Sequence, residues 1–515
     1  MPRSIKTHSK PSPTIRLSHL LNKIKLVNPK IDPLIGGLTN NSCQVKTNDL
    51  FIACRGTKVD AHFFIAEALA KGAAAVLCER QLPKKITANN LFPKVPIIVV
   101  PQLKEHLSYL AAEFYNHPAK KMIMIGVTGT NGKTTITKCL ANALTMLKIP
   151  CGAIGTFGID FLNYYQSTLN TTPDPIWLQQ QLAKLQTLGA KAVAMEVSSH
   201  GLIQKRTAAI NFDLAIFTNL TRDHLDTHRT MANYAKAKKQ LFLNHQPAIA
   251  IINSDDQYGL KLIKELKLVT KNTTIYTYGT RPSPIKTLPS ITAQKINATF
   301  PKTSFEIVGP WGTHKITSKL IGKFNISNLL AVYIALNVIE LKEKSVSEII
   351  KSLEKLTPIK GRMEFIKKTN RPLVVIDYAH TPDALEQVLI NLKDYCSGKL
   401  WCIFGCGGNR DATKRPLMGK IAEKYSNYLI ITNDNPRAED PKQIINEIKT
   451  GLKKPSAALI KPSRKKAIIH VLDHAQLKDI ILIAGKGHEN YQLINNKRFA
   501  FSDREVVLEQ LNRDL

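Results

Sequence analysis

A glycine-containing loop with a lysine and paired threonines is the feature of this sequence that most directly indicates chemistry. The stretch MIMIGVTGTNGKTT runs from an apolar segment into Gly132, Lys133, Thr134 and Thr135. In such loops the backbone N–H groups surround phosphates, the lysine contacts the outer phosphates and the hydroxyl reaches Mg²⁺. We therefore predict that Lys133 holds the β- and γ-phosphates of ATP and that Thr134 is a ligand of Mg²⁺.

The loop departs from the usual phosphate-binding motif, which has a glycine five positions before Gly132. That position is Val127, and the nearby glycines are Gly126 and Gly129. A tight strand-to-helix turn without a ligand is the structural alternative, but glycines, lysine and paired threonines together favour phosphate. The loop does not indicate whether the phosphoryl group goes to water or to another acceptor.

Two further clusters in the middle of the chain could bind a metal ion. Glu196 in MEVSSHGL ends a predicted strand, where a carboxylate can complete the oxygen shell of Mg²⁺. NLTRDHLDTH places Asp223, His224, Asp226 and His228 within six residues. Zinc is disfavoured because no cysteine or third histidine follows at ligand spacing. A structural role for His224 and a solvated role for Glu196 stay open at this point.

Three loops in the last third of the chain carry residues suited to a charged amino acid. Arginine binds carboxylates bidentately, and acidic side chains hold ammonium groups. Surface salt bridges are the alternative explanation. The residues are Arg410 in GCGGNRD, Asp434, Asn435 and Arg437 in NDNPRAED, and Gly485 and Glu489 in AGKGHE.

The elements that position these residues are predicted from recurring apolar strands followed by polar residues, with helical patterns between them. Continuous apolar strands that alternate with helices indicate parallel sheets covered on both faces. Ligands of such sheets gather beyond the carboxyl ends of the strands, which is where the polar clusters lie. Strands are predicted in KKMIMIGV, KAVAMEVSSH, FDLAIFTNLTRDH, AIAIINSDD, LVVIDYAHTPD, LWCIFGCGGNRD, YLIITNDNPR and IILIAGKGHE.

The length of 515 residues predicts about three domains. We expect an α/β protein with a small N-terminal α/β domain at 1–102, a central P-loop ATPase domain with a parallel sheet at 103–359, and a C-terminal Rossmann-like domain at 360–515. The N-terminal MPRSIKTHSKPSPTIR is basic and lacks the apolar core of a secretion signal, so it is interpreted as a ragged tail.

Composition indicates a soluble protein, with 43% hydrophobic and 22% charged residues and no apolar run long enough to span a membrane. Eight scattered cysteines are typical of reduced thiols in the cytoplasm. The net charge of +33 could indicate nucleic-acid binding. The lysines, however, occur all along the chain without interleaved aromatic residues, so a general lysine bias is favoured.

Taken together, these segments resemble the Mur ligases of peptidoglycan synthesis. GVTGTNGKTT is similar to the P-loop of that family. The resemblance runs from about residue 35 through TGTNGKTT, NTTPD, MEVSSHGL, FTNLTRDHLD, GKFNISN, GRME, DYAHTPDAL, GCGGNRD, DNPR and AGKGHE, in that order.

The resemblance implies an ATP-dependent acid–amino-acid ligase that releases ADP and phosphate. DNPR resembles the form that takes meso-2,6-diaminopimelate, which would be added to UDP-N-acetylmuramoyl-L-alanyl-D-glutamate. ATP would phosphorylate the D-glutamyl carboxylate, and the amine would then attack the acyl phosphate. The implied protein is a cytoplasmic monomer that binds these small molecules, ATP and Mg²⁺, and neither nucleic acid nor membrane.

The resemblance also implies roles for particular residues. The catalytic residues are Lys133, Glu196, His224 and Lys238. Thr134 and Glu196 resemble the ligands of one Mg²⁺, and His224 resembles a ligand of a second. Lys238, whose neighbours are Lys236 and Lys239, matches a lysine that supplies an anionic oxygen to the metal site as a carbamate. ATP is bound by Gly129, Thr130, Asn131, Gly132, Lys133, Thr134, Thr135, Asn325 and Arg362. The UDP-sugar peptide is bound by Ser42, Asn170, Thr171, Thr172, Ser198, Gln204 and Arg206. The amino acid is bound by Arg410, Asp434, Asn435, Pro436, Arg437, Gly485 and Glu489.

The N-terminal segment departs from the family pattern, and several rivals remain. Relatives often have DSR where this chain has Asn41, Ser42 and Cys43. A lysine-adding ligase is the nearest rival, and Arg437 disfavours it because lysine has no second carboxylate. A folylpolyglutamate synthase would lack DNPR and the long N-terminal domain. A nucleic-acid-binding ATPase would show hydrolysis stimulated by DNA or RNA.

Overall fold

The computed structural model describes residues 14–24, 29–56, 59–81, 94–270, 272–339 and 344–512. The chain forms two compact units that alternate along the sequence. Unit 1 comprises residues 1–126, 149–213 and 240–247, and unit 2 comprises residues 127–148, 214–239 and 248–515. Among the described residues, no helix is both long and apolar enough to cross a membrane.

The N-terminal part of unit 1 is a four-stranded parallel sheet with helices on both faces. Leu50 and Ile52 of the second strand pack with helices α1 and α4, whereas Phe51 and Ala53 pack with α2. This alternation follows from the two-residue period of a strand. The strand order is β3 (Gly37–Thr39), β4 (Asp49–Ala53), β5 (Ala75–Cys78) and β6 (Ile97–Val99), and the helices are α1 (Leu17–Lys23), α2 (Ile65–Ala70) and α4 (Leu103–Phe114).

The predicted ragged tail is wrong for its last residues. Ile15–Arg16 form strand β1, which pairs antiparallel with β2 (Leu34–Ile35). Ile15 packs against the cluster that contains the fully buried Leu17 and Ile35, so burial of apolar surface orders this segment. The rest of the predicted tail, up to residue 13, lies outside the described residues.

The remainder of unit 1 contains strands that follow one another in the order β10, β9, β8 and β11. β8 and β11 are parallel, and β8, β9 and β10 form antiparallel pairs. Helix α6 begins with Asp174 as its N-cap, and α7 begins with Ser198. The bounds are β8 (Cys151–Gly155), β9 (Gly158–Phe161), β10 (Tyr164–Gln166), β11 (Ala192–Glu196), α6 (Pro175–Thr187) and α7 (Ser199–Ile203).

The first part of unit 2 carries the P-loop, between β7 (Ile123–Thr128) and helix α5 (Lys133–Met146). β7 begins in unit 1 and ends in unit 2. Strands β12 to β15 are parallel neighbours, and β15, β16 and β17 extend them as an antiparallel meander. The other elements are β12 (Leu214–Phe217), β13 (Ile249–Asn253), β14 (Thr274–Gly279), β15 (Ser290–Thr299), β16 (Lys302–Gly309), β17 (Gly312–Ser318), α8 (Leu225–His228), α9 (Met231–Leu243), α10 (Gln257–Val269), α11 (Lys323–Val338) and α12 (Val346–Glu354).

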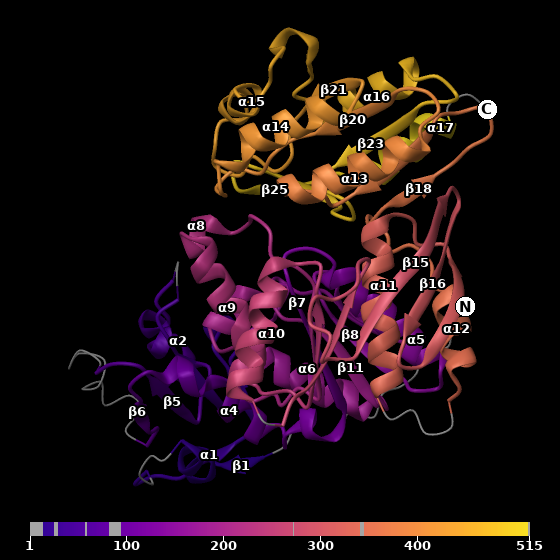
Figure 1. Cartoon of the computed structure of the whole chain (residues 1–515). Coiled ribbons are helices and arrows are strands. Elements are labelled where there is room, and N and C mark those ends of the chain that lie inside the picture. The colour runs from indigo at the N-terminus through magenta and orange to yellow at the C-terminus, as the bar shows by residue number, and fades with distance from the viewer. Residues whose placement is uncertain are drawn as a thin grey trace, which may run out of the picture. The chain divides into compact units, whose positions relative to one another are not determined.

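The last part of unit 2 is a six-stranded sheet between two layers of helices (Figure 1). Val375 and Leu482 pack with α13, α14 and α15, whereas Val374 and Ile481 pack with α16 and α17. The sheet has the order β18 (Glu364–Ile366), β19 (Leu373–Asp377), β23 (Ile480–Ala484), β20 (Leu400–Phe404), β21 (Tyr428–Ile431) and β22 (Leu459–Ile460). The helices are α13 (Pro382–Tyr395), α14 (Lys414–Tyr425), α15 (Pro441–Lys449), α16 (Arg464–His474) and α17 (Asp503–Asn512), and β24 (Tyr491–Ile494) and β25 (Lys497–Ala500) form a hairpin.

The predicted α/β class is confirmed, since strands form at all eight predicted apolar segments and the predicted polar clusters follow them. The P-loop follows β7, Asp377 ends β19, and Gly485 directly follows β23. This placement matches the rule that ligands of parallel sheets bind beyond the carboxyl ends of strands. The predicted domain boundaries at residues 102 and 359 stay a prediction.

Candidate active site

The P-loop requires glycine at two positions. Gly129 has φ +146°, and a Cβ there would lie 1.8 Å from Oγ1 of Thr218. Gly132 has φ +86°, and its Cβ would lie 2.6 Å from Oδ1 of Asn328. Both positions therefore exclude a side chain for conformational and steric reasons. The glycines of the altered motif are thus explained by the backbone path of this loop.

The segment after β12 holds the P-loop in place. Asn219 accepts a hydrogen bond from Asn131 N at 2.9 Å through Oδ1 and from Thr130 N at 2.8 Å through its backbone oxygen. Thr218 Oγ1 donates to the backbone oxygen of Asn131 at 2.6 Å. Thr218 and Asn219 of the segment FTNLTRDH therefore hold the backbone of the phosphate loop by hydrogen bonds.

Two lysines meet on the same backbone oxygen of the P-loop. Lys133 Nζ donates to Gly129 O at 2.8 Å and to Thr130 O at 2.7 Å. Lys238 Nζ donates to Gly129 O at 2.7 Å and lies 4.6 Å from the ring centroid of Tyr234. Burial, and then the charge of Lys133, lowers the pKa of Lys238 well below its ordinary value, although Asp223 opposes this. The surroundings of Lys238 therefore favour a neutral amine at the P-loop.

The neighbouring lysines differ from Lys238 in a way that settles which of the three faces the P-loop. Lys236 is exposed, and Lys239 forms an ion pair with Glu265. Only Lys238 of these three is bonded to the phosphate loop among the contacts of the described residues. The register assigned to Lys238 therefore agrees with its geometry.

Asp223 lies between two histidines. His224 Nε2 is 3.3 Å and His380 Nε2 is 3.8 Å from Oδ2 of Asp223. Burial alone would raise the pKa of the Asp223 carboxyl, but His224, His380 and Lys414 lower it below its ordinary value. His224 has φ +54°, a strained conformation for a residue with a side chain, and occupies the N-cap position of α8 without a side-chain cap hydrogen bond. Asp223 thus stays an anion beside both imidazoles.

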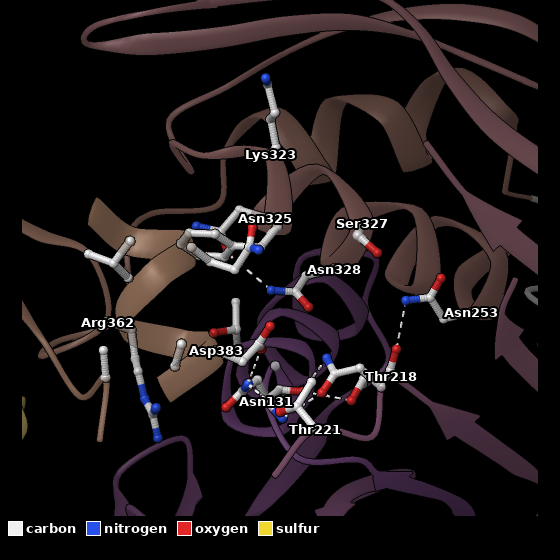
Figure 2. Close-up of a pocket in the computed structure, with 18 of the residues that line it drawn as sticks. Asn131, Thr218, Thr221, Asn253, Lys323, Asn325, Ser327, Asn328, Arg362 and Asp383 are labelled. Atoms are coloured by element: carbon white, nitrogen blue, oxygen red, sulfur yellow. Dashed lines mark hydrogen bonds between the residues drawn. The ribbon is translucent and has the colours of Figure 1, made fainter. Parts of the chain in front are cut away.

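A cavity of about 380 Å³ within unit 2 lies beside the P-loop. Figure 2 shows Asn131, Asn325, Asn328 and Arg362 around it. Asn325 is held by Ile321 O at 2.8 Å, and its own Oδ1 accepts from Asn328 Nδ2 at 3.1 Å. The lining also includes Gly132, Thr135, Thr218, Asn219, Thr221, Asn253, Asp255, Asp256, Tyr278, Thr280, Leu320, Lys323, Phe324, Ser327, Ile359, Asp377, Tyr378, Ala379, His380, Asp383, Ala384, Gln387 and Val388.

Arg362 is brought to the P-loop as predicted from GRME. Its Nη2 donates to Oγ1 of Thr134 at 3.2 Å, and its guanidinium lies 4.3 Å from the ring centroid of Tyr378. The stacked ring orients the guanidinium while leaving its in-plane N–H groups for anionic ligands. The cavity therefore combines a phosphate loop, amide side chains and an arginine, a set that suits a nucleotide.

Glu196 ends β11 in unit 1 and is 2% exposed. Thr156 holds both of its carboxylate oxygens, through its N–H at 2.9 Å and its Oγ1 at 3.1 Å. The same Oγ1 lies 3.2 Å from Oγ1 of Thr171. A Cβ at Gly155 would collide with Glu196 Oε1 at 2.2 Å, so the glycine makes room for the carboxylate. A solvated strand-capping role for Glu196 is thereby excluded.

Most residues predicted for the sugar-peptide substrate lie together in unit 1. Thr172 Oγ1 donates to Glu196 O at 2.8 Å and accepts from Ser198 N at 2.9 Å. Arg206 Nη1 donates to Thr172 O at 2.5 Å, and its Nη2 donates to Gln204 Oε1 at 2.6 Å. These contacts connect the loops after β10 and β11. Asn170 in the same loop is exposed.

Ser42 comes from the N-terminal sheet of unit 1 and is tied to this cluster through its neighbours. Asn40 Nδ2 donates to Asp174 Oδ2 at 2.9 Å, which joins the segment before Ser42 to the segment after Thr172. Asn41 Oδ1 accepts from Cys43 N at 3.0 Å and so caps the short helix η1 (Ser42–Gln44). An asparagine caps a helix as well as an aspartate does. The departure at Asn41 therefore preserves the local backbone.

The predicted amino-acid site forms one hydrogen-bonded cluster at the ends of β21 and β23. Asn435 Nδ2 donates to Glu489 Oε2 at 2.9 Å, and Asn435 N donates to Asp434 Oδ1 at 2.6 Å. Gly485 has φ +111°, and a Cβ there would lie 2.7 Å from Asp434 Oδ2. Only glycine lets the β23 loop approach this carboxylate so closely.

Arg437 and Arg410 lie beside the glycine-rich turn after β20. Arg437 Nη1 donates to Gly408 O at 2.8 Å, and a Cβ at Gly407 would lie 2.7 Å from that nitrogen. Burial, and then the positive charge of Arg410, lowers the pKa of Arg437. An anionic ligand beside Arg437 would offset this positive charge. Arg410 itself is exposed. Pro436, between Asn435 and Arg437, is buried.

Sequence reasoning missed three buried cations that support this site. Arg415 is 1% exposed and donates to Gly407 O at 3.2 Å and to Glu439 Oε2 at 2.7 Å. Arg464 pairs with Asp503 at 2.7 Å and donates to Ala484 O at 2.9 Å. Lys486 is 0% exposed and contacts Glu489. Lys486 stands within the AGKGHE motif and could have been noticed there, whereas Arg415 and Arg464 lie in helices with no local signal.

The donor set agrees with Mg²⁺ better than with zinc. Across the described residues, no group of three His, Cys, Asp or Glu side chains is placed to hold a metal ion. Mg²⁺ commonly takes one or two protein oxygens and completes its shell with substrate phosphates and water. The hydroxyl of Thr134, 5% exposed at the start of α5, and an anionic derivative of Lys238 fit that pattern in unit 2.

Comparison with known proteins gives consistent matches along the chain. Family models described as "Mur ligase family, catalytic domain", "Mur ligase middle domain" and "Mur ligase, glutamate ligase domain" match residues 34–115, 127–336 and 361–487. A protein of Coxiella burnetii named UDP-N-acetylmuramoyl-L-alanyl-D-glutamate--2,6-diaminopimelate ligase is 43% identical over 486 residues, 93% of this chain and 96% of that protein. The protein of that name from Buchnera aphidicola is 44% identical over 481 residues, with the same coverage. A solved structure of a ligase of that name has a TM-score of 0.67 and 34% identity, covering 97% of this chain and 99% of the other.

Proposed function

The chain belongs to the Mur ligase family, and from this premise we propose that it adds meso-2,6-diaminopimelate to UDP-N-acetylmuramoyl-L-alanyl-D-glutamate with consumption of ATP. The observation that carries the proposal is the identity of 43% and 44% to two ligases of that name, each over 93% of this chain. The reaction is a step of peptidoglycan precursor synthesis.

Activation of the D-glutamyl carboxylate is the first step. A carboxylate oxygen attacks the γ-phosphorus of ATP, ADP leaves, and an acyl phosphate forms. Lys133 and Arg362 carry the positive charges next to the phosphate loop that offset the charge of the transferred group. Activation is needed because an amine does not displace an oxide ion from a carboxylate, whereas phosphate is a competent leaving group.

Amide formation is the second step. The unprotonated amine of diaminopimelate attacks the acyl carbon, a tetrahedral intermediate forms, and the bond to phosphate breaks. The nitrogen loses a proton on the way to the neutral amide. The chain's part in this step is to place the amine. The carboxylates of Asp434 and Glu489 suit the ammonium groups of the amino acid, and Arg437 beside them suits a carboxylate.

Mg²⁺ would offset phosphate charge and orient the γ-phosphoryl group when bound. In unit 2, Thr134 would be a ligand of one Mg²⁺ and His224 a ligand of a second, and Lys238 would supply an anionic oxygen as a carbamate, formed from its neutral amine and CO₂ with release of one proton. The lowered pKa of Lys238, which burial and Lys133 cause, favours the neutral amine that this reaction needs. Glu196, in unit 1, stays a predicted Mg²⁺ ligand.

Selection of diaminopimelate over lysine is assigned to Arg437. Diaminopimelate has a second carboxylate, and lysine has none. The half-buried guanidinium beside Gly408 would keep an unpaired positive charge if lysine were bound. We also expect a cytoplasmic monomer, in keeping with small-molecule substrates.

The test is a ligation assay with purified protein, ATP, Mg²⁺ and UDP-N-acetylmuramoyl-L-Ala-D-Glu. Meso-diaminopimelate or L-lysine is supplied in parallel, phosphate release is followed, and the products are identified by mass. The expected result is a tripeptide product with diaminopimelate alone. Turnover with lysine alone would overturn the substrate assignment, and absence of product with both, together with hydrolysis stimulated by nucleic acid, would overturn the ligase.

A further inference from the structure

A fully buried lysine, Lys486, stands inside the loop that follows β23. Its exposed fraction is 0%, and it lies between Gly485 and Gly487, which have φ +111° and +52°. Burying an ammonium group is costly unless hydrogen bonds replace its water shell. The hydrogen-bond partners of Lys486 therefore indicate which residues the buried ammonium group serves.

Lys486 closes a three-membered network with two residues of the predicted amino-acid site. Its Nζ donates to Asn435 Oδ1 at 3.1 Å and to Glu489 Oε2 at 2.8 Å. Asn435 Nδ2 donates to the same Glu489 oxygen at 2.9 Å. The lysine also lies 5.5 Å from the ring centroid of Tyr491. Every side of the triangle is thus a hydrogen bond.

The network fixes the orientation of both partners. Asn435 Oδ1 accepts from Lys486 and also from Leu493 N at 3.0 Å, so the amide of Asn435 cannot flip without losing both bonds. Glu489 Oε2 is used twice, by Lys486 and by Asn435. Within the described part of the chain, Oε1 is therefore the oxygen of Glu489 that is left for a ligand.

We propose that Lys486 is a positioning residue for the amino-acid substrate, acting by holding Glu489 and Asn435 in their binding orientation. The inference rests on the proposed function and deepens it, because Glu489 would hold the ammonium group at the far end of diaminopimelate through Oε1. Without Lys486, Oε2 would lose a charged partner and the carboxylate could rotate. Binding of the amino acid would then weaken, while the nucleotide pocket would keep its lining.

The loop itself is anchored without Lys486, which makes the proposal testable by substitution. Arg464 donates to Ala484 O at 2.9 Å, and Gly485 N donates to Asp377 O at 3.1 Å. Arg464 is in turn held by the fully buried Asp503. These bonds fix the end of β23, so loss of the Lys486 ammonium leaves the strand and its exit in place.

The experiment compares Lys486→Met, which keeps length but removes the charge, with Lys486→Arg and with Lys497→Met on the exposed strand β25. Steady-state KM values for meso-diaminopimelate and for ATP are measured in the ligation assay. We expect Lys486→Met to raise the KM for diaminopimelate by about tenfold or more, with the KM for ATP changed by less than about twofold. Lys486→Arg restores part of the loss, and Lys497→Met behaves as wild type.

A double substitution separates positioning from a general structural role. If Lys486 acts through Glu489, Lys486→Met adds little to the KM of a Glu489→Gln protein, because the carboxylate that it orients is already gone. Equal, additive losses in both backgrounds, or parallel increases in the KM values for ATP and diaminopimelate with a lower urea midpoint, would overturn the proposal. If Lys486→Met does not fold, the same comparison is made with Lys486→Arg.

The proposal and the assigned reaction can fail separately. Wild-type turnover with diaminopimelate together with an unchanged Lys486→Met protein would remove the role of Lys486 and keep the ligase. Absence of wild-type turnover with diaminopimelate would overturn both.

Discussion

Asn131 of the P-loop donates a hydrogen bond of 2.9 Å from Nδ2 to Oδ2 of Asp383, across 252 residues of sequence (Figure 2). Asp383 lies in the first turn of α13, directly after the segment that follows β19. Burial raises the pKa of its carboxyl, and the bond from Asn131 opposes that rise. The nucleotide loop is therefore tied to helix α13 within unit 2 by a partly buried polar contact.

Replacing Asp383 should weaken the use of ATP. In Asp383→Ala the side chain of Asn131 loses its charged acceptor, and a hydrogen bond to a charged group is worth about 1.5–3 kcal/mol. We expect kcat/KM for ATP to fall by about tenfold or more, and Asp383→Asn to lose less because its amide oxygen still accepts. Asp394→Ala, at an exposed position of the same helix, is the matched control. Equal kcat/KM values for Asp383→Ala and the control would show that the contact does not matter for the nucleotide.

Removing the amine of Lys238 should abolish ligation. Lys238→Met cannot form a carbamate, and it leaves Gly129 O without one of its two lysine partners. We expect kcat to fall by about a thousandfold or more, which corresponds to roughly 4 kcal/mol of lost transition-state stabilisation. The direct measurement is ¹³C NMR of the protein in ¹³C-bicarbonate, where wild type gives a carbamate signal that Lys238→Met lacks.

The two neighbours of Lys238 provide the controls for that measurement. Lys236→Met removes an exposed lysine, and Lys239→Met removes the partner of Glu265. Both variants should keep the carbamate signal. Retention of the signal in Lys238→Met and its loss in Lys239→Met would mean that the modified residue had been assigned one position too early.

Much of the fold could be predicted from the sequence because its physical signals are local. A strand such as Leu373–Asp377 is a continuous apolar run, and the polar residues that follow it lie beyond its carboxyl end by the geometry of parallel sheets. The order of strands in each sheet is not local, since β23 pairs between β19 and β20 although two strands separate it from β20 in sequence. Such pairing depends on packing between distant segments.

The residues of the candidate site also divide into those with a local sequence signal and those without one. Lys133, Arg362 and Glu489 stand in motifs with recognisable spacing, so their types and places could be predicted. The role of Arg415 could not be predicted, because it depends on contacts with Gly407 and Glu439 that only the folded chain creates. The ordered strand at Ile15–Arg16 was missed for a related reason, since its partner is the short segment Leu34–Ile35 and neither is long enough to give a pattern.

Gly487→Ala should destabilise the C-terminal part of unit 2 and impair both substrates. Gly487 has φ +52°, and a Cβ there would lie 2.6 Å from Gly361 O and 2.8 Å from Cβ of Tyr378. Gly361 precedes Arg362 at the nucleotide cavity, and Gly487 follows Lys486 at the amino-acid cluster. A Cβ at residue 487 would therefore displace residues at both the nucleotide cavity and the amino-acid cluster. We expect the free energy of unfolding to fall by about 2 kcal/mol or more.

The control for Gly487 isolates the steric part of that effect. Gly189 also has positive φ, +96°, but a Cβ there would meet no atom within 4 Å. Gly189→Ala should cost about 1 kcal/mol, from backbone conformation alone. Urea unfolding of the two variants measures the difference, and similar midpoints would show that the contact between Gly361 and Gly487 is not tight.

Arg437 should decide between diaminopimelate and lysine. In Arg437→Met the second carboxylate of diaminopimelate loses its partner, and we expect its KM to rise by about a hundredfold, equivalent to roughly 3 kcal/mol for a charged hydrogen bond. Binding of lysine, which has no second carboxylate, should not weaken, so the preference for diaminopimelate decreases. Arg504→Met removes a charge from the same part of the unit, where Arg504 pairs with Glu364, and serves as the control. A preserved preference for diaminopimelate in Arg437→Met would place selection elsewhere.

His488 should make the protein less stable as pH falls below neutrality. Burial first, and then the charges of Arg362, Lys360 and Lys486, lower the pKa of His488 to about 3. An unfolded chain protonates this residue near pH 6.5, so between pH 6.5 and 3 the unfolded state binds more protons and stability decreases as pH falls. The slope from one proton is at most about 1.4 kcal/mol per pH unit. We expect urea midpoints measured from pH 7.5 to 5 to decline less in His488→Gln than in wild type. An equal decline of the urea midpoint in both proteins would mean that His488 is protonated as readily in the folded protein as in the unfolded chain.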